Sequence, residues 1–107
     1  MTDGISAEQF LEAEGVEDWR VLPSGEVAAY FATGKFAAGV TLIDEVGRLA
    51  DEANHHPDVD LRYKGVTVRL SSHDLGGLSE RDVALARAIS AAARELGVAA
   101  EPSAVQP

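Results

Sequence analysis

The sequence predicts a single α+β domain whose elements follow in the order helix, strand, strand, helix, strand, strand, helix. Three observations carry this prediction. Apolar residues recur at helical spacing in two long segments, 36–53 and 80–96. Two runs that alternate in polarity stand close together within 59–71, as the arms of a hairpin do. The length of 107 residues suits one domain with a modest core.

The first part of the chain is predicted to form a short helix and two strands. Ser6 is a candidate N-cap for a helical segment over 6–14, with Gln9 as its reciprocal partner three positions later. The strand candidates are Trp19–Leu22 and Val27–Ala32, and the letters PSGE between them are typical of a turn.

The longest predicted helix runs from Phe36 to about Ala53. Its apolar stripe consists of Phe36, Val40, Ile43, Gly47 and Ala50, widened by Leu42, Val46 and Leu49. Asn54 is a plausible end for this helix because Pro57 follows shortly after it.

The final helix is predicted from Glu80 to about Leu96. Ser79 is suited to be its N-cap, and Asp82 stands at the third helical position, where it would complete a capping box. Gly97 follows as a C-terminal cap.

Charge and composition narrow the class of protein. The net charge of −9 argues against nucleic acid or an anionic membrane as a partner, because both require clustered Lys and Arg. There is no cysteine, no long apolar run and no signal-peptide pattern, so we expect a cytoplasmic protein. Residues 1–4 and 99–107 offer little to pack, and we expect them to be disordered tails of one domain spanning 1–107.

The hairpin is the most informative segment. If Lys64–Gly65 is its two-residue turn, Leu61 faces Val68 and Val59 faces Leu70 on an apolar face, with Tyr63 facing Val66. The other face is then polar, which supports this register.

The same register, extended past the strand ends, places His56 opposite His73. His55 then lies at the end of the long helix, one residue away. The three histidines of the chain are therefore predicted to converge, which favours a site for acid–base chemistry.

Several of these motifs occur together in one known family. The letters HHPD at 55–58, SSHD at 71–74 and GGLSERD at 76–82, with Asp51 four residues before the first histidine, resemble the pterin-4a-carbinolamine dehydratases. The resemblance implies a four-stranded antiparallel sheet with helices packed on one face. It also implies a homodimer or homotetramer.

The resemblance further implies a reaction. Family members dehydrate a 4a-hydroxytetrahydropterin to the quinonoid dihydropterin, which follows the action of an aromatic amino acid hydroxylase in the same pathway. No metal and no organic cofactor are implied, because the pterin is the substrate.

The resemblance assigns roles to particular residues. His55 and His73 would be the acid–base groups, His56 would hold the pterin ring and its hydroxyl, and Asp82 would orient a histidine. Asp51 would act similarly from the helix end. The remaining candidates for substrate contact are Arg81 and Trp19.

Other interpretations remain open at this point. Asp82 can be a helix cap, a catalytic partner or both, and Trp19 is more often a core residue. Asp51, His55 and His73 could instead form a metal site with two histidines and one carboxylate. A second class of function is a non-catalytic binding or dimerisation module that acts as a protein cofactor, as some family members do.

Overall fold

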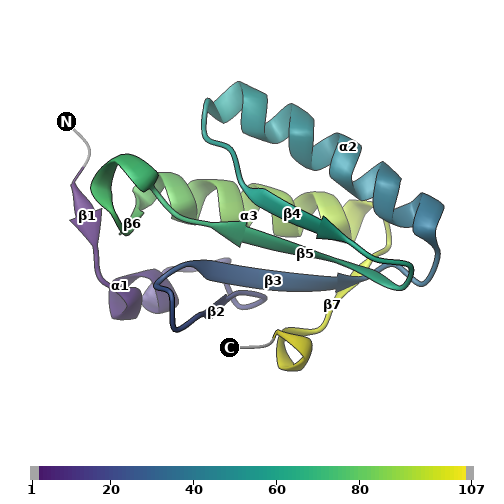
Figure 1. Ribbon diagram of the computed structural model, residues 1–107, viewed down its shortest axis with the longest axis horizontal. Coiled ribbons are helices and arrows are strands. Elements are labelled where there is room, and N and C mark those ends of the chain that lie inside the picture. The colour runs from purple at the N-terminus through teal and green to yellow at the C-terminus, as the bar shows by residue number, and fades with distance from the viewer. Residues whose placement is uncertain (1–2, 106–107) are drawn as a thin grey trace.

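The computed structural model of the protein describes residues 3–105. The α-helices of this part are α1 (Ala7–Glu12), α2 (Phe36–Ala53) and α3 (Glu80–Glu95), and short 3₁₀ helices span His73–Leu75 and Pro102–Ala104. The strands are β1 (Gly4–Ile5), β2 (Arg20–Val21), β3 (Val27–Ala32), β4 (Asp58–Leu61), β5 (Gly65–Leu70), β6 (Leu78–Ser79) and β7 (Ala99–Ala100) (Figure 1). None of these helices is long and apolar enough to cross a membrane.

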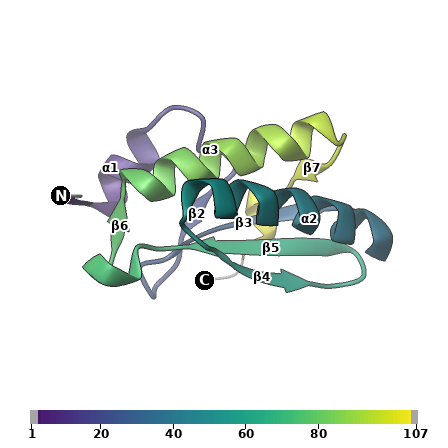
Figure 2. The same cartoon turned by 90° about the horizontal axis from the view of Figure 1, so that it is seen from above.

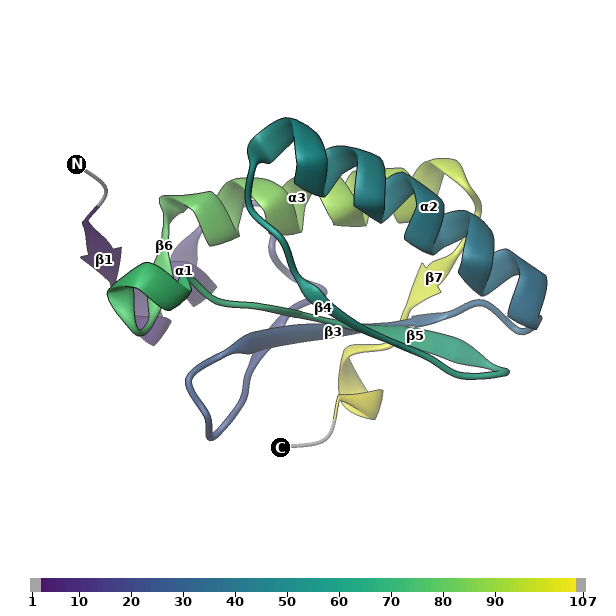
Figure 3. The ribbon, with the colours of Figure 1, turned by 45° about the horizontal axis from the view of Figure 1, so that its top comes forward.

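One antiparallel sheet forms the base of the molecule. Its strands lie in the order β2-β3-β5-β4, and β7 pairs with the end of β3 on the side of β2. Helices α2 and α3 lie over one face of this sheet (Figures 1 and 3), and they run side by side (Figure 2). The predicted α+β class and antiparallel pairing are confirmed, but β7 brings the sheet to five strands instead of four.

The core fills the space between the two long helices and the sheet. Its largest fully buried side chains include Trp19, Phe10, Phe31, Leu42, Leu70 and Ile89. Both N-terminal capping boxes are present as predicted, one joining Ser6 and Gln9 and the other joining Ser79 and Asp82. These short-range contacts set where α1 and α3 begin.

Helix α2 has the predicted bounds, but it buries only part of the predicted stripe, together with Gly39. The buried residues are Gly39, Leu42, Val46 and Ala50, whereas the predicted stripe members Phe36 and Val40 are 52% and 49% exposed. A Cβ atom added at Gly39 would lie 2.6 Å from Cδ1 of Leu61, so glycine lets the helix approach the hairpin closely. The side of α2 that faces the sheet therefore includes Gly39, and Phe36 and Val40 lie on the exposed side.

The predicted register of the β4–β5 hairpin is wrong by two residues. Leu61 pairs with Val66 and Val59 pairs with Val68, and the loop consists of Tyr63 and Lys64. A shift of two residues keeps every side chain on its predicted face, because strand side chains alternate with a period of two. Tyr63, which the sequence placed on the apolar face, lies in the loop and is 70% exposed.

Gly65 explains why the loop does not use Lys64 and Gly65. Gly65 is a strand residue paired with Ala32, and it is buried beneath the ring of Tyr30 from β3. A Cβ atom at Gly65 would lie 2.1 Å from the Tyr30 hydroxyl oxygen. The glycine therefore serves a contact between strands and not the turn.

Replacing Gly65 with alanine is expected to lower the free energy of unfolding by about 1–3 kcal/mol, because the Tyr30 ring must move. Gly47→Ala is the matched control: its added Cβ meets nothing within 4 Å, and it should stabilise helix α2 by about 0.5–1 kcal/mol. Urea unfolding of both variants checks this. Equal effects of the two substitutions would contradict the role given to Tyr30.

The predicted disordered tails are ordered where the structure describes them. Gly4 pairs with Ser79 in the β1–β6 ladder, and β7 extends the edge of β3. The backbone N–H of Glu101 donates a hydrogen bond to the Tyr30 carbonyl at 2.8 Å. Strand β2 covers only the start of β3, so the other end of β3 has free backbone groups for β7 to pair with. Residues 1–2 and 106–107 lie outside the described residues.

Candidate functional site

His55 is placed by the end of helix α2. Asn54 adopts a left-handed backbone conformation, with φ of 50°, a conformation that asparagine tolerates better than most residues. The chain turns back there, and the backbone N–H of His55 donates to the Ala50 carbonyl at 3.1 Å. The His55 side chain is consequently buried, with the residue 8% exposed.

Asp82 holds the imidazole of His55 from the first turn of α3. Its Oδ1 lies 2.7 Å from His55 Nε2, and Asp82 itself is fully buried. Its Oδ2 accepts the backbone N–H of Ser79 at 2.9 Å, which is the capping-box bond. Of the alternatives left open by the sequence, capping is thus certain for Asp82, and the same carboxyl group also binds a histidine.

The Asp82 bonds define the tautomer of His55. An ionised carboxylate only accepts hydrogen bonds, so Nε2 of His55 carries the proton that points to Asp82. The other ring nitrogen, Nδ1, then carries no proton when the ring is neutral.

His56 pairs with a different carboxylate. Its Nε2 lies 3.0 Å from Asp51 Oδ1, and both side chains are exposed. They stand at one side of a cavity of about 190 Å³ between α2 and β4. The rest of its lining is apolar or backbone and consists of Ile43, Val46, Gly47, Ala50, Pro57 and Val59.

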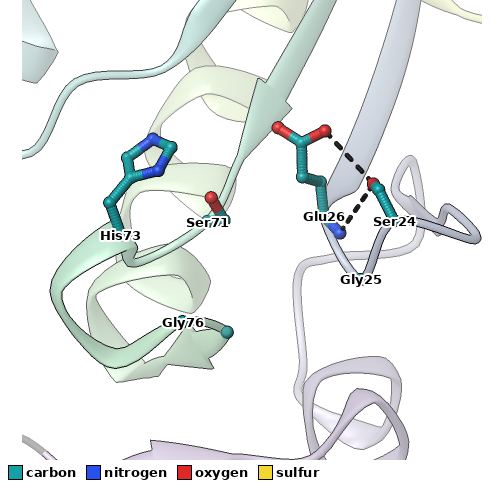
Figure 4. A pocket seen from close by; sticks show the side chains of 7 residues that line it. Ser24, Gly25, Glu26, Ser71, His73 and Gly76 are labelled. Carbon is teal, nitrogen blue, oxygen red and sulfur yellow. Dashed lines mark hydrogen bonds between the residues drawn. The ribbon is translucent and has the colours of Figure 1, made fainter.

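His73 stands in a second cavity, of about 130 Å³, formed where β5 ends and the 3₁₀ helix begins. Figure 4 shows His73 and Glu26 on either side of Ser71. The same cavity is lined by Ser24, Gly25, Gly76 and Gly77. His73 is exposed, and it is not opposite His56 because β4 begins at Asp58 and β5 ends at Leu70. The predicted cross-strand pair of histidines is therefore wrong.

Asp74, the residue after His73, forms an ion pair with Arg81 of helix α3. The Arg81 guanidinium donates a hydrogen bond to Asp74 Oδ1 at 2.6 Å, and this bond holds the pKa of the Asp74 carboxyl below its ordinary value. Arg81 also donates to the hydroxyl oxygen of Ser79 through its Nε at 3.3 Å. Arg81 thus links the 3₁₀ helix His73–Leu75 to the first turn of α3.

Trp19 lines neither cavity, and the structure places it in the core, the alternative that the sequence had left open. Its ring is fully buried, packs edge-on against Phe31 and donates a hydrogen bond from Nε1 to the Ser90 hydroxyl at 3.0 Å. Indole is the largest apolar side chain, and the core of this small domain takes it up.

The set of ligands suggested for a metal does not assemble in this arrangement. Asp51 binds His56, and His55 has its Nε2 directed to Asp82. Within residues 3–105, no three side chains of the metal-binding types gather into one group.

Two features of the site escaped the sequence analysis. Ser72 is fully buried, and its hydroxyl donates to Asp82 Oδ2 at 2.9 Å. Glu26 enters the His73 cavity from the β2–β3 turn. Ser72 lies within the SSHD motif, so its place in that motif could have marked it as a candidate site residue. Glu26 is far from His73 in the sequence, and no motif marked it.

Fold and site together define a small α+β protein in which two histidines are each paired with an aspartate. Residues 3–92 match the model of the pterin 4 alpha carbinolamine dehydratase family. The chain therefore belongs to this family.

Individual relatives agree with that assignment. The chain is 39% identical over 94 residues to a protein of Nocardia farcinica, covering 87% of this chain and 98% of the relative. It is 43% identical over 72 residues to one of Chloroflexus aggregans, covering 67% and 77%. Both relatives carry the name "Putative pterin-4-alpha-carbinolamine dehydratase".

A solved structure shares the fold. The Brucella melitensis protein described as "transcriptional coactivator/pterin dehydratase" superposes with a TM-score of 0.78 at 22% identity. The match covers 85% of this chain and 99% of that one.

Proposed function

We propose that the protein dehydrates a 4a-hydroxytetrahydropterin to the quinonoid dihydropterin by histidine acid–base catalysis. The observation that carries this proposal is the buried His55–Asp82 pair, 2.7 Å apart, in a member of the pterin dehydratase family. A carboxylate that fixes one ring nitrogen of a histidine leaves the other free for proton transfer.

The reaction needs two proton transfers. One proton is delivered to the 4a-hydroxyl, so that the C4a–O bond breaks and water leaves. A second proton is removed from N5, whose electrons form the C4a–N5 double bond. One proton is added and one is removed, so the substrate loses only water and the reaction needs no oxidant. We propose that it uses neither a metal nor an organic cofactor.

In this proposal His55 and His73 are the acid–base groups that deliver and remove these two protons. His56, held by Asp51, positions the pterin ring and its hydroxyl, and Asp82 orients His55. Arg81 contacts the substrate from the edge of the site. Each role draws on the family resemblance. His56 and Asp51 line one cavity and His73 lines the other, whereas His55 and Asp82 form a buried pair.

A direct assay tests the proposal. Freshly made 4a-hydroxytetrahydropterin is mixed with purified protein, and its ultraviolet absorbance is followed against the spontaneous reaction. We expect acceleration that is proportional to protein concentration. A rate equal to the spontaneous one would refute the enzymatic function.

A binding function is the second candidate, and exposed apolar side chains on helix α2 favour it. Phe36 and Val40 lie one turn apart and are each about half exposed. We propose that the protein is a cytoplasmic homodimer or homotetramer, and light scattering would test its mass in solution. If the assay shows no activity, a role as a non-catalytic dimerisation module becomes the better proposal.

A further inference from the structure

Three fully buried polar residues form a cluster at the start of helix α3. Asp82 and Ser79 belong to the helix cap, and Ser72 lies between β5 and the 3₁₀ helix His73–Leu75. The Ser72 hydroxyl oxygen lies 2.9 Å from Asp82 Oδ2 and 2.7 Å from the Ser79 hydroxyl oxygen. Buried polar groups are costly unless they are hydrogen-bonded, and here each one is.

The directions of these bonds follow from the available protons. The ionised Asp82 carboxylate only accepts, so the single hydroxyl proton of Ser72 is donated to it. Ser72 must then accept from Ser79, whose own oxygen accepts the backbone N–H of Arg81 at 3.2 Å. The hydroxyl protons therefore run in one direction, from Ser79 through Ser72 to Asp82, and bonds in such a chain strengthen one another.

The two carboxylate oxygens of Asp82 bind different partners. Oδ2 receives two donors, the Ser72 hydroxyl and the Ser79 N–H, while Oδ1 receives His55 Nε2. The carboxylate plane cannot rotate without breaking these bonds. Its fixed plane in turn fixes the plane of the His55 ring.

We infer that Ser72 is a positioning residue for His55, acting through Asp82. This inference rests on the proposed dehydratase function for its effect on rate. It also makes a claim about His55 that holds without any activity: loss of the Ser72 hydroxyl lets the Asp82 carboxylate turn, and the His55 ring loses its single tautomer.

The test compares Ser72→Ala with Ser90→Ala. Ser90 is also a buried serine, and it accepts the Trp19 N–H in the core away from both cavities, so its loss reproduces the removal of a buried hydroxyl. We expect Ser72→Ala to lower kcat by roughly 10- to 100-fold with KM little changed, by analogy with the hydrogen-bond partners that orient metal-bound histidines, whose loss has effects of this size. Ser90→Ala should leave kcat within about twofold of the wild type, a range that separates it from a loss of tenfold or more.

Nitrogen NMR of the histidine rings supplies a readout independent of catalysis. In the wild type, His55 should show one tautomer with the proton on Nε2. In Ser72→Ala the signals should move toward a mixture, whereas in Ser90→Ala they should not. Unchanged His55 signals in a folded Ser72→Ala protein overturn the inference, even if the wild type proves inactive.

A second substitution guards against failure to fold. Ser72→Cys fills nearly the same space but supplies only a weak S–H donor. We expect a loss of kcat and a shift of the His55 signals in the same direction as for alanine. Wild-type values of both quantities in Ser72→Cys, together with an unfolded Ser72→Ala protein, would make Ser72 structural only and refute the positioning role.

Discussion

Replacing His73 with alanine is expected to lower kcat for the 4a-hydroxytetrahydropterin by roughly 100- to 10,000-fold, the range for loss of a general acid or base. The free energy of unfolding should stay within about 0.5 kcal/mol of the wild type, because the side chain is exposed. Stopped-flow absorbance measures the first quantity and urea unfolding the second.

His73→Gln separates proton transfer from simple contact. Glutamine keeps a polar side chain of similar length in the cavity beside Ser71 and Glu26, but it does not titrate near neutral pH. It should therefore be as inactive as alanine. A His73→Gln protein that retains more than half of the wild-type kcat would show that His73 only contacts the substrate.

Replacing Asp82 with alanine is expected to have the largest effect on stability of any single substitution in the site. It leaves the Ser72 hydroxyl, the Ser79 N–H and His55 without their acceptor, and unpaired buried donors cost about 1–3 kcal/mol each. We expect a loss of about 3 kcal/mol or more in the free energy of unfolding, together with loss of activity. Urea unfolding followed by circular dichroism measures it.

Asp82→Asn is the control for this substitution. The amide keeps one accepting oxygen of the same shape, so the cap can persist and the stability loss should be less than half that of alanine. The amide nitrogen, however, cannot accept a bond, so either His55 or Ser72 loses its partner. If alanine costs under about 1 kcal/mol, the buried bonds to Asp82 contribute less than their geometry suggests.

Short-range features of the chain were predictable. Both capping boxes, the bounds of α2 and its end at Asn54 depend on residues a few positions apart, and the local sequence is enough to predict them. Asp82 was predicted as a cap and as a partner of a histidine for separate reasons, and the two roles coincide in one carboxyl group.

Long-range features were not predictable in the same way. The alternation of polar and apolar residues determines which face a strand residue occupies but not which residue it pairs with. The predicted hairpin register was therefore displaced by two residues. The correct loop depends on Tyr30, which lies over Gly65 from another strand. Likewise, nothing local shows that β3 has a free end for β7. The predicted cross-strand pairing of His56 with His73 failed together with the register.

The double use of Asp82 has a consequence for comparing relatives. A protein that has given up the reaction still needs the start of helix α3, so selection for folding alone can retain an aspartate at this position. Its presence is then a poor marker of activity. His55 and Ser72 take no part in the capping box of α3. The loss of both the histidine and the hydroxyl would therefore be a clearer sign that a relative has changed its function.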